Sequence, residues 1–586
     1  MARRRDSLLS TASSLYFVYS VILFIFTVIL FVFNKIYKES FQTRTPIYQK
    51  LTNVYMPYEY IAPAYNSRLY PSAPTTFATS VLVDINNAIH RYNVSEKFIS
   101  FSFETPHGHM FLADMYGNRR TSFTNLMNTF RTMNNSSVGP HIRLGAGQGH
   151  VHYYPSDPTY KKYLDTYKYI NDFKGSLSFQ LPLAQQSPID PTKDTFSLPN
   201  SNDLVYSSNV VRYLKNTLGF STLIVQLGNE PDYIMFARNN KHGQPIYENS
   251  NVAYSNYITR MNAYVNLLNP MVGSNIIIGA FASPNQATSW GSRFINSNLA
   301  SFSNKVKYVS THHYAGCDCG DNKFEDGYRP VSGYTPQLLL NKTYNINLSL
   351  VPIAGRLNIE HHIGETNSIC CSGQFGVSDT FASALWVIDY TLYVKYNNVK
   401  RINYHNHIIP NGVYTIVSYP DAYRSVTSEI VNVKPISHGL LLLYYILRSK
   451  GKLFRIEEPN QSSTLRKWII KSSTEWNIVF LHMKSSEGNI RVELNKLTNN
   501  NKSAKLYRLV CQTDISAKNG ISFAGLTFEG TTDGNLKNCR TNATVPPSGL
   551  TSYLNNSSNY ETVNLINNKY TFIVGKTSAV VLTIPL

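Results

Sequence analysis

Two glutamates in this sequence follow apolar runs and could act as a pair. Glu230 stands between Asn229 and Pro231, directly after one such run, and Glu365 comes after another, Leu357–Ile363. Two carboxylates that face each other across a pocket can hydrolyse a glycosidic bond. One protonates the leaving oxygen, while the other attacks the anomeric carbon or activates water. This chemistry needs no metal and no cofactor, but it needs a fold that brings the two glutamates together.

The runs that precede these glutamates belong to a series of eight strand-like segments, which alternate with segments compatible with helices. The runs are Ile99–Phe103, His141–Ala146, Ser176–Leu183, Thr222–Leu227, Asn275–Ala280, Lys307–Tyr314, Leu357–Ile363 and Val399–His405. Eight βα units predict an α/β fold with a closed (β/α)8 barrel. Functional residues of such a barrel lie at the carboxyl ends of its strands. Glu230 and Glu365 follow the fourth and seventh strands, which we expect to face each other across the mouth.

Other polar residues end the predicted strands and could line the same pocket. They are Glu104 after the first strand, His312, His313 and Tyr314 on the sixth, and His405 and Asn406 on the eighth. The adjacent histidines could suggest a metal site. Neighbouring residues of a strand point to opposite faces, however, so His312 and His313 cannot easily share one ion, and neither can His361 and His362. We therefore expect packing and hydrogen-bonding roles for both pairs, and a structural role for Glu360.

Proline 231 makes a separate prediction about the backbone. Its ring restricts its own φ to about −65°, and it biases the residue before it away from the helical region. We therefore expect an extended backbone at Glu230.

The remaining chain divides into regions of different composition. Residues 446–586 contain short alternating strands separated by Asn, Ser, Gly and Thr turns, which predict an antiparallel β-sandwich. Residues 34–75 are mixed in composition, with Pro and Tyr, and are interpreted as a stalk that adds one or two strands to this β-domain. The barrel is then predicted to occupy residues 76–445.

An uncharged apolar segment at 15–33 follows a basic tail at 1–14 that contains Arg3, Arg4 and Arg5. At about 1.5 Å per residue the segment nearly spans a bilayer core of roughly 30 Å, and the arginines favour a cytosolic tail. This predicts a single-pass type II membrane protein whose body faces the lumen or the exterior. A cleaved signal peptide is the alternative and would give a secreted protein. Recurrent N-glycosylation sequons agree with both, for example at Asn93, Asn135, Asn341, Asn347, Asn460, Asn501, Asn542 and Asn556.

The formal net charge of +19 suggests an acidic partner such as a polyanionic glycan, a nucleic acid or a membrane surface. The basic residues are scattered, so drift in composition explains the charge nearly as well. The sequence shows no nucleic-acid-binding motif, and no nucleic-acid partner is expected.

Six cysteines fall in three close groups: Cys317 with Cys319, Cys370 with Cys371, and Cys511 with Cys539. In an exported chain an even number of cysteines predicts disulfides, and the spacings fit zinc sites poorly. The first two groups follow the sixth and seventh strands, whose loops are neighbours, so we expect at least one bridge between them. A separate Cys511–Cys539 bridge is expected in the β-domain.

The segments around the two glutamates resemble glycoside hydrolase family 79, the family of heparanases and microbial β-glucuronidases. The resemblance rests on "GNEP" at 228–231 and "GETNS" at 364–368, and continues in "GVSDTFASALW" at 376–386 and in the C-terminal "SAVVLTIPL". It covers most of the chain from about residue 95 onward and looks most like the microbial and fungal β-glucuronidase branch. It implies a clan A glycosidase barrel with a β-sandwich domain.

The resemblance implies a role for each matching residue. Glu230 matches the general acid/base, Glu365 the nucleophile, Asn229 an amide that contacts the sugar 2-hydroxyl, Tyr314 a tyrosine that supports the nucleophile, Glu104 a residue that binds sugar hydroxyls, and Tyr414 a tyrosine near the uronate carboxylate. The family commonly holds that carboxylate with backbone N–H groups of a glycine-rich stretch. Here Gly373 remains, but Cys371 and Ser372 stand where glycine is usual, so binding by Ser372 and Gly373 is expected with altered details.

These observations predict a retaining, exo-acting β-glucuronidase whose partner is a glucuronic-acid-containing oligo- or polysaccharide. Two alternatives remain open. One is an endo-acting enzyme, similar to a heparanase or a hyaluronidase, which the basic charge would suit. The other is an inactive glycan-binding relative, although retention of both glutamates argues against it.

Overall fold

The computed structural model describes residues 73–586 except for 86–87, 115, 146–157, 184, 187–193, 196–200, 232–249, 283–289, 317–333, 371, 408–412, 420–430, 457–463 and 498–501. The basic tail, the apolar segment 15–33 and nearly all of the predicted stalk lie outside these residues, so the membrane anchor stays a prediction. Within the described ranges, no helix has both the length and the apolar character that crossing a bilayer requires.

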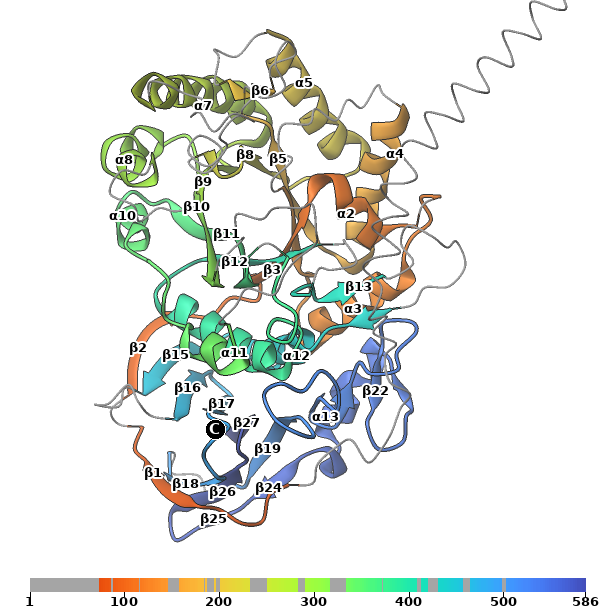
Figure 1. The fold of residues 1–586 in the computed structure, drawn as a ribbon, viewed down its shortest axis with the longest axis vertical. Coiled ribbons are helices and arrows are strands. Elements are labelled where there is room, and N and C mark those ends of the chain that lie inside the picture. Colours follow the sequence, from red (N-terminus) through yellow and green to blue (C-terminus); the bar gives the residue numbers. More distant parts are fainter. Residues whose placement is uncertain are drawn as a thin grey trace, which may run out of the picture. The chain divides into compact units, whose positions relative to one another are not determined.

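Eight parallel strands close into a barrel, which confirms the predicted βα series (Figure 1). Around the ring the order is β10-β11-β12-β3-β4-β5-β8-β9. The strands are β3 (Ile99–Glu104), β4 (His141–Gly145), β5 (Ser176–Leu181), β8 (Ile224–Leu227), β9 (Ile276–Phe281), β10 (Tyr308–Gly316), β11 (Glu360–Ile369) and β12 (Arg401–Asn406). They are buried along almost their whole length, as expected for strands covered by helices on one face and by a packed interior on the other.

Helices on the outside of the barrel connect these strands. They are α2 (Thr105–Leu112), α3 (Thr121–Met133), α4 (Pro158–Thr166), α5 (Ser201–Arg212), α7 (Ser250–Val272), α8 (Trp290–Ser297), α9 (Pro336–Asn341), α10 (Leu350–Arg356), α11 (Phe381–Tyr396) and α12 (Ile436–Leu447). Short two-stranded ribbons lie in the loops: β6 (Gln185–Gln186) with β7 (Asp194–Thr195), and β13 (Val417–Ser418) with β14 (Asn432–Val433).

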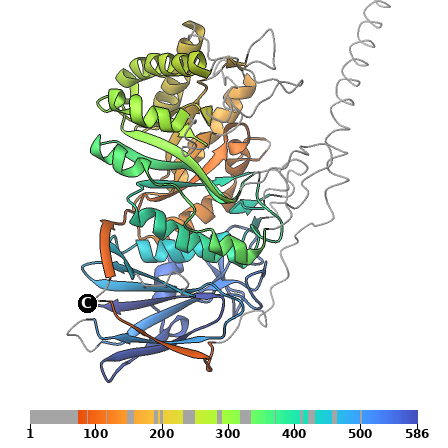
Figure 2. The same cartoon turned by 60° about the vertical axis from the view of Figure 1, so that its left-hand side comes forward.

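Helices α11 and α12 lie between the barrel strands and the C-terminal β-sheets (Figures 1 and 2). Both are apolar almost all round, which is the pattern of a helix buried on every side. They pack closely because Gly439 of α12 has no side chain. A Cβ at that position would lie 2.2 Å from the carbonyl oxygen of Ala384 on α11. The end of the barrel that faces these helices is thereby joined to the β-domain through a continuous core.

The β-domain consists of two sheets with an apolar core between them, as the predicted sandwich requires. Strands of the large sheet alternate between two cores. Ile469 and Ile478 face the core shared with the small sheet, while Trp468 and Val479 join the core that contains α11 and α12. The indole N–H of Trp468 donates to Asp389 of α11 at 2.8 Å, which ties the sheet to the barrel.

The large sheet runs β2-β15-β16-β17-β27-β19-β20-β21-β22-β23, with β24 paired to β19, and the small sheet runs β1-β18-β26-β25. The strands are β1 (Thr79–Val83), β2 (Ala88–Asn93), β15 (Lys452–Ile456), β16 (Leu465–Lys471), β17 (Glu475–His482), β18 (Ile490–Asn495), β19 (Ala504–Val510), β20 (Ser522–Phe523), β21 (Leu526–Thr527), β22 (Leu536–Asn538), β23 (Thr544–Val545), β24 (Glu561–Val563), β25 (Leu565–Ile566), β26 (Lys569–Val574) and β27 (Ser578–Pro585), and a short helix, α13 (Leu550–Asn555), lies between β23 and β24.

The N-terminal contribution to this domain comes later in the chain than expected. Strands β1 and β2 pair with β18 and β15, and both lie after residue 75. The predicted barrel range of 76–445 therefore begins too early, because the first barrel strand is β3. Strand β1 also runs parallel to β18, so the small sheet is not purely antiparallel.

The predicted Cys511–Cys539 bridge is wrong, because both cysteines are buried and neither is disulfide-bonded. Cys511 follows β19 and Cys539 follows β22, and strands β20 and β21 lie between these two strands in the sheet. Cys370 is disulfide-bonded. Cys317, Cys319 and Cys371 lie outside the described residues, so the bridge expected between the sixth and seventh strand loops stays a prediction.

Candidate active site

Glu230 lies just beyond the carboxyl end of β8 in an unusual backbone conformation. Its φ is +43°, and Gly228 before it has a φ of +71°. The expectation of an extended backbone at Glu230 is therefore wrong. The influence of Pro231 is outweighed by a contact with the neighbouring strand β9, since the Glu230 N–H donates to the carbonyl oxygen of Ala280 at 2.9 Å. Left-handed backbone at a residue other than glycine is uncommon, and it clusters at functional sites.

The second carboxylate, Glu365, lies in the middle of β11 and is held from several sides. The Tyr314 hydroxyl donates to Oε1 at 2.6 Å, and the Arg143 guanidinium donates to Oε2 at 3.1 Å. Burial alone raises the pKa of Glu365, but His405, His312, Arg143 and the Tyr314 hydrogen bond together hold that pKa well below its usual range. The site therefore keeps Glu365 ionised. Tyr314 stays protonated, because burial and the Glu365 carboxylate raise its pKa.

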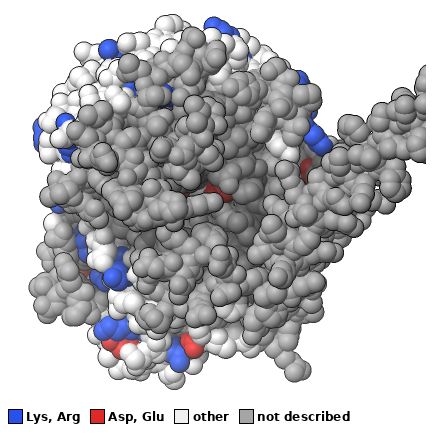
Figure 3. Space-filling model, turned by 45° about the horizontal axis from the view of Figure 1, so that its top comes forward, with Lys and Arg blue, Asp and Glu red and all other residues white. Residues whose placement is uncertain are grey.

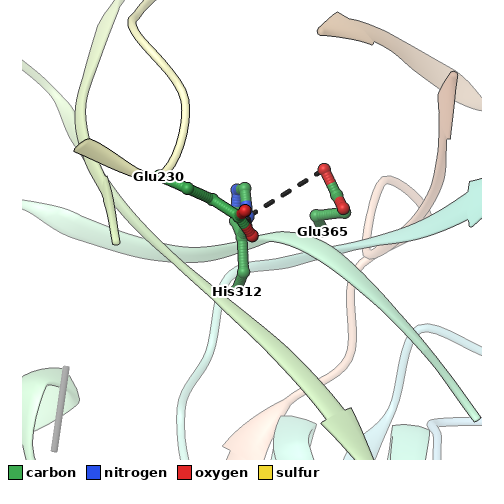
Figure 4. A group of neighbouring side chains, drawn as sticks. All are labelled: Glu230, His312 and Glu365. Carbon is green, nitrogen blue, oxygen red and sulfur yellow. Dashed lines mark hydrogen bonds and ion pairs between the residues drawn. The ribbon is translucent and has the colours of Figure 1, made fainter. Parts of the chain in front are cut away.

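The two carboxylates converge over the barrel mouth (Figure 4). One oxygen of each, together with a ring nitrogen of His312, lies within 4.8 Å of the others. Nδ1 of His312 is 2.8 Å from Oε1 of Glu230 and 3.9 Å from Oε2 of Glu365. Carboxyl groups about 5–5.5 Å apart are typical of retaining glycosidases, whereas inverting enzymes leave about 6.5–9.5 Å for a water. The bound of 4.8 Å between the two carboxylate oxygens lies closer to the first of these ranges than to the second.

Arginine 143, in the middle of β4, organises the site and was not assigned a role from the sequence. Its side chain is fully buried, and its donors reach Gln226 at 2.8 Å, Ser102 at 2.7 Å and Asn229 at 2.6 Å, besides Glu365. Arginine only donates, so it fixes the Asn229 carbonyl oxygen toward itself and leaves the amide N–H2 group for another acceptor. The signal in the sequence was a charged residue inside an apolar strand, since a buried arginine needs partners on neighbouring strands.

Aromatic rings form a wall beside Glu365. The rings of Tyr314 and Tyr414 are stacked with centroids 6.2 Å apart, and Tyr414 meets His405 edge-on at 6.1 Å. The side-chain amide of Asn367 donates to the carbonyl oxygens of both Tyr414 and His405, at 3.0 and 2.9 Å, which fixes the loop that carries Tyr414 against β12. The structure therefore brings Tyr314 and Tyr414, both predicted from the sequence, to one side of the nucleophile candidate.

The other predicted residues lie further around the mouth. Glu104 ends β3, and its Oε2 lies 3.2 Å from Nε2 of His407, another residue that sequence reasoning missed. Nδ1 of His407 lies 3.2 Å from Oγ of Ser372. The N–H of Gly373, expected to face the substrate, donates instead to the Cys370 carbonyl oxygen at 3.2 Å. That turn closes on itself, so this backbone donor does not point into the site.

Three of the four histidines have the packing or hydrogen-bonding roles expected for them. His313 packs with its ring stacked on Tyr390 at 5.8 Å. His361 bonds to Thr311 at 2.9 Å, and His362 lies 3.7 Å from Glu360 at the amino end of β11. His312, by contrast, contacts both carboxylates, a place in the site that the sequence did not assign to it.

A cation could also be ligated by this group of side chains, which offers carboxylate oxygens from Glu230 and Glu365 and a ring nitrogen from His312. The Arg143 guanidinium already places a positive charge 3.1 Å from Glu365, and it would repel a metal ion there.

Acidic side-chain atoms lie at the centre of the face that carries the strand ends (Figure 3). Lys and Arg side chains appear at several places around the edge of this view.

No family model matches this chain, and no curated protein matches it. Solved structures do share its fold. A 4-O-α-L-rhamnosyl-β-D-glucuronidase from Fusarium oxysporum 12S aligns with a TM-score of 0.60 at 16% identity, covering 89% of this chain and 100% of that one. A family 51 α-L-arabinofuranosidase from Thermotoga petrophila RKU-1 gives 0.53 at 11% identity, covering 86% and 100%. Another from Bifidobacterium longum gives 0.51 at 10%, covering 87% and 100%. These structural neighbours are glycoside hydrolases, and at such identities the likeness shows the fold.

Proposed function

We propose that this protein is a retaining, exo-acting β-glucuronidase that resembles glycoside hydrolase family 79 and acts on glucuronic-acid-containing glycans. One observation carries the proposal: the carboxylates of Glu230, just beyond the end of β8, and Glu365, in the middle of β11, converge with oxygens within 4.8 Å of each other. The glycoside hydrolase fold of the structural neighbours supports a glycan-degrading activity. The rhamnosyl-glucuronidase among them supports, together with the family resemblance, a uronic acid as the sugar.

The reaction would proceed by double displacement. Glu365 attacks the anomeric carbon, and the carbon–oxygen bond to the leaving group breaks while Glu230 gives its proton to the departing oxygen. This forms a covalent glycosyl ester on Glu365 and leaves Glu230 ionised. Glu230 then takes a proton from water, whose oxygen attacks the anomeric carbon, and Glu365 is released as a carboxylate. Two inversions at the same carbon give net retention.

Neighbouring side chains suit the two glutamates to these different tasks. Arg143 and Tyr314 stabilise the carboxylate form of Glu365, which the attack requires. Glu230 is more exposed, with 22% of its side chain accessible against 9% for Glu365, so it can reach a leaving group and then a water. The amide N–H2 group of Asn229, whose carbonyl oxygen Arg143 fixes, can donate to the 2-hydroxyl of the sugar.

Hydrolysis of 4-nitrophenyl β-D-glucuronide by the purified protein tests the proposal, and proton NMR of the first product tests retention. We expect release of the β-anomer of glucuronic acid. Release of the α-anomer would overturn the double displacement. Binding of glucuronides without turnover would instead support an inactive glycan-binding relative.

One surface feature favours the endo-acting alternative. A cavity of about 300 Å³, formed by the segment after α2 and by α4, is lined by Tyr116, Lys161, Lys162 and Lys168 among others. Lysines around an exposed tyrosine could contact a long polyanionic chain beyond the cleaved sugar. Cleavage of heparan sulfate into large fragments, slowed by Lys162→Glu with Lys168→Glu, would favour endo action. Release of single sugars, unaffected by these changes, would favour exo action.

We also propose that residues 15–33 anchor the protein with its catalytic body in the lumen or at the exterior. The supporting features are the apolar sequence and the arginines that precede it. Extraction of membranes at alkaline pH should leave the full chain in the membrane fraction. Its appearance in the soluble fraction, shortened at the N-terminus, would show a cleaved signal peptide.

A further inference from the structure

Polar atoms without a protein partner gather inside the barrel, on the amino side of Glu365. They are Oγ of Ser100, Oγ of Ser310, Nδ1 of His362 and Oδ1 of Asn403. All four residues are buried, and none of these atoms forms a hydrogen bond within the described part of the chain. Their strands, β3, β10, β11 and β12, are neighbours in the barrel. Because burying an unpaired polar group is costly, a cluster of them requires partners other than side chains and backbone.

The alternation of side chains along the strands shows that these positions point into the barrel. The Tyr404 hydroxyl lies 2.6 Å from a hydroxyl of helix α11, on the outside, so its neighbour Asn403 points inward. Phe101 stacks on a ring of helix α3, so its neighbour Ser100 points inward too. Bulky branched side chains usually fill the inside of such a barrel. Serine and asparagine leave space there that polar atoms line, which is the place that a buried water occupies.

His312 connects this region with the acid/base candidate (Figure 4). Its Nδ1 lies 2.8 Å from Oε1 of Glu230, while its Nε2 is buried and has no hydrogen-bond partner among the described residues. The hydrogen bond at one ring nitrogen of a histidine fixes what the other nitrogen presents. A group that bonds to Nε2 therefore orients the ring against Glu230.

Ser310 is placed to supply that bond through one water. A Cβ at Gly364 would lie 2.2 Å from Oγ of Ser310 and 3.2 Å from Nε2 of His312, so both polar atoms lie beside the bare backbone of this glycine. The two atoms are close together, yet they form no direct hydrogen bond. A bridging water with two bonds of roughly 2.8 Å joins polar atoms up to about 5.5 Å apart. It can donate to one atom and accept from the other, so it suits either tautomer of the ring.

We propose that the inside of the barrel holds ordered water at this place, and that Ser310 positions His312, and through it Glu230, by way of one such water. This inference rests on the proposed glycosidase function and names a further residue that supports its acid/base. Ser310 acts through His312, so it is a positioning residue and not a catalytic one. The bridging water is distinct from the water that hydrolyses the glycosyl ester, and it makes and breaks no bond of the sugar.

The test uses two leaving groups that depend differently on Glu230. Phenol needs a proton from the general acid as it departs, whereas 2,4-dinitrophenol leaves without that help. In Ser310→Val the hydroxyl is replaced by methyl groups, which exclude the water. We expect kcat/KM for phenyl β-D-glucuronide to fall at least about tenfold, the size of one hydrogen bond. For 2,4-dinitrophenyl β-D-glucuronide we expect a change of less than about threefold. Equal losses on both substrates, or no loss on either, would overturn the proposal.

The next residue of β10 provides a matched control. Thr311 is also buried, but its hydroxyl bonds to His361 instead. Thr311→Val should therefore leave the ratio of the two kcat/KM values as it is in wild type. A loss in Thr311→Val that depends on the leaving group would assign the effect to packing of β10 and contradict the proposal. Ser310→Ala, with a smaller loss in the same direction, serves if circular dichroism shows that Ser310→Val does not fold.

High-resolution crystal structures of wild type and Ser310→Val test the water without any measurement of activity. We expect a water within about 3 Å of both Nε2 of His312 and Oγ of Ser310 in the wild type, and none at Nε2 in the variant. If the wild type cleaves no glucuronide, the proposed function fails, while this result still decides whether the water is present. A direct bond between the two side chains, or another protein group at Nε2, would overturn the inference.

Discussion

Both ends of the barrel bury titratable side chains, but they arrange them differently. At the carboxyl end, Arg143, Tyr314 and His312 all approach Glu365. At the amino end, each histidine has partners of its own. His361 bonds to Thr311, and His141 bonds to Ser176 and Ser178 at 2.8 and 3.0 Å.

The comparison shows that burial of a titratable group does not by itself identify a functional site. A hydroxyl can pair with a neutral imidazole, so these histidines can be buried without a compensating charge. Several donors that converge on a carboxylate from different strands keep it ionised in a buried place. Burying an ionised carboxylate costs free energy, and the proposed reaction needs such a carboxylate as its nucleophile.

The largest effect is expected from the same substitution at two positions of one strand. Glu365→Gln should lower kcat on an aryl β-glucuronide by at least about 10⁴-fold, because it removes the nucleophile. Glu360→Gln, at the amino end of β11, should change kcat by less than about threefold. Steady-state kinetics measure both. Activity that survives Glu365→Gln would exclude the proposed covalent step.

Two arginines, one at each end of the barrel, provide the second test. Arg143→Gln should lower kcat/KM by about 10²–10³-fold, since Glu365 and Asn229 both lose a charge-assisted partner. It should also raise the pKa of Glu365, so the acidic limb of the pH–rate profile moves to higher pH. Arg401→Gln, on the amino end of β12, should affect stability and leave that limb in place. Coincident pH profiles of Arg143→Gln and wild type would contradict this role of Arg143.

Removal of one hydroxyl beside the nucleophile should have a smaller effect. Tyr314→Phe loses the 2.6 Å hydrogen bond to Glu365, and kcat should fall about tenfold with the acidic limb again moved upward. Tyr390→Phe is the matched control, because that buried hydroxyl contacts Thr366 and not a carboxylate. A loss of activity in Tyr390→Phe equal to that in Tyr314→Phe would mean that packing alone accounts for both.

The histidines at the amino end of the barrel should influence how the stability of the protein depends on pH. Burial lowers the pKa of His361 to about 3 and that of His362 to about 4, against 6.5 for an exposed histidine. The unfolded chain therefore binds more protons between these values, so the free energy of unfolding decreases as pH falls from about 6.5 toward 4. The melting temperature should fall on acidification, and in His361→Gln the fall should be smaller by about 2 °C or more. An equal fall of the melting temperature in both proteins would show that His361 does not contribute to this pH dependence.

Much of the fold could be predicted because it depends on local patterns. Eight apolar runs with helical segments between them admit few topologies, and the strand ends of a barrel meet at one mouth. For that reason the placement of Glu230, Glu365, Glu104 and Tyr314 followed from the sequence. Arg143 could have been suspected from a charge inside a strand, but its partners lie on three other strands that the sequence does not align.

The sequence by itself determined the barrel, the β-domain and the two carboxylates, because periodicity and strand-end motifs are properties of short segments. Tertiary structure decided everything that depends on register between distant segments. It set the left-handed backbone of Glu230 against Ala280, placed His312 between two carboxylates and joined Glu104, His407 and Ser372 into one chain. It also left Cys511 and Cys539 without a disulfide. Contacts of this kind arise only when strands are aligned in space, and a neighbour in sequence carries no information about that alignment.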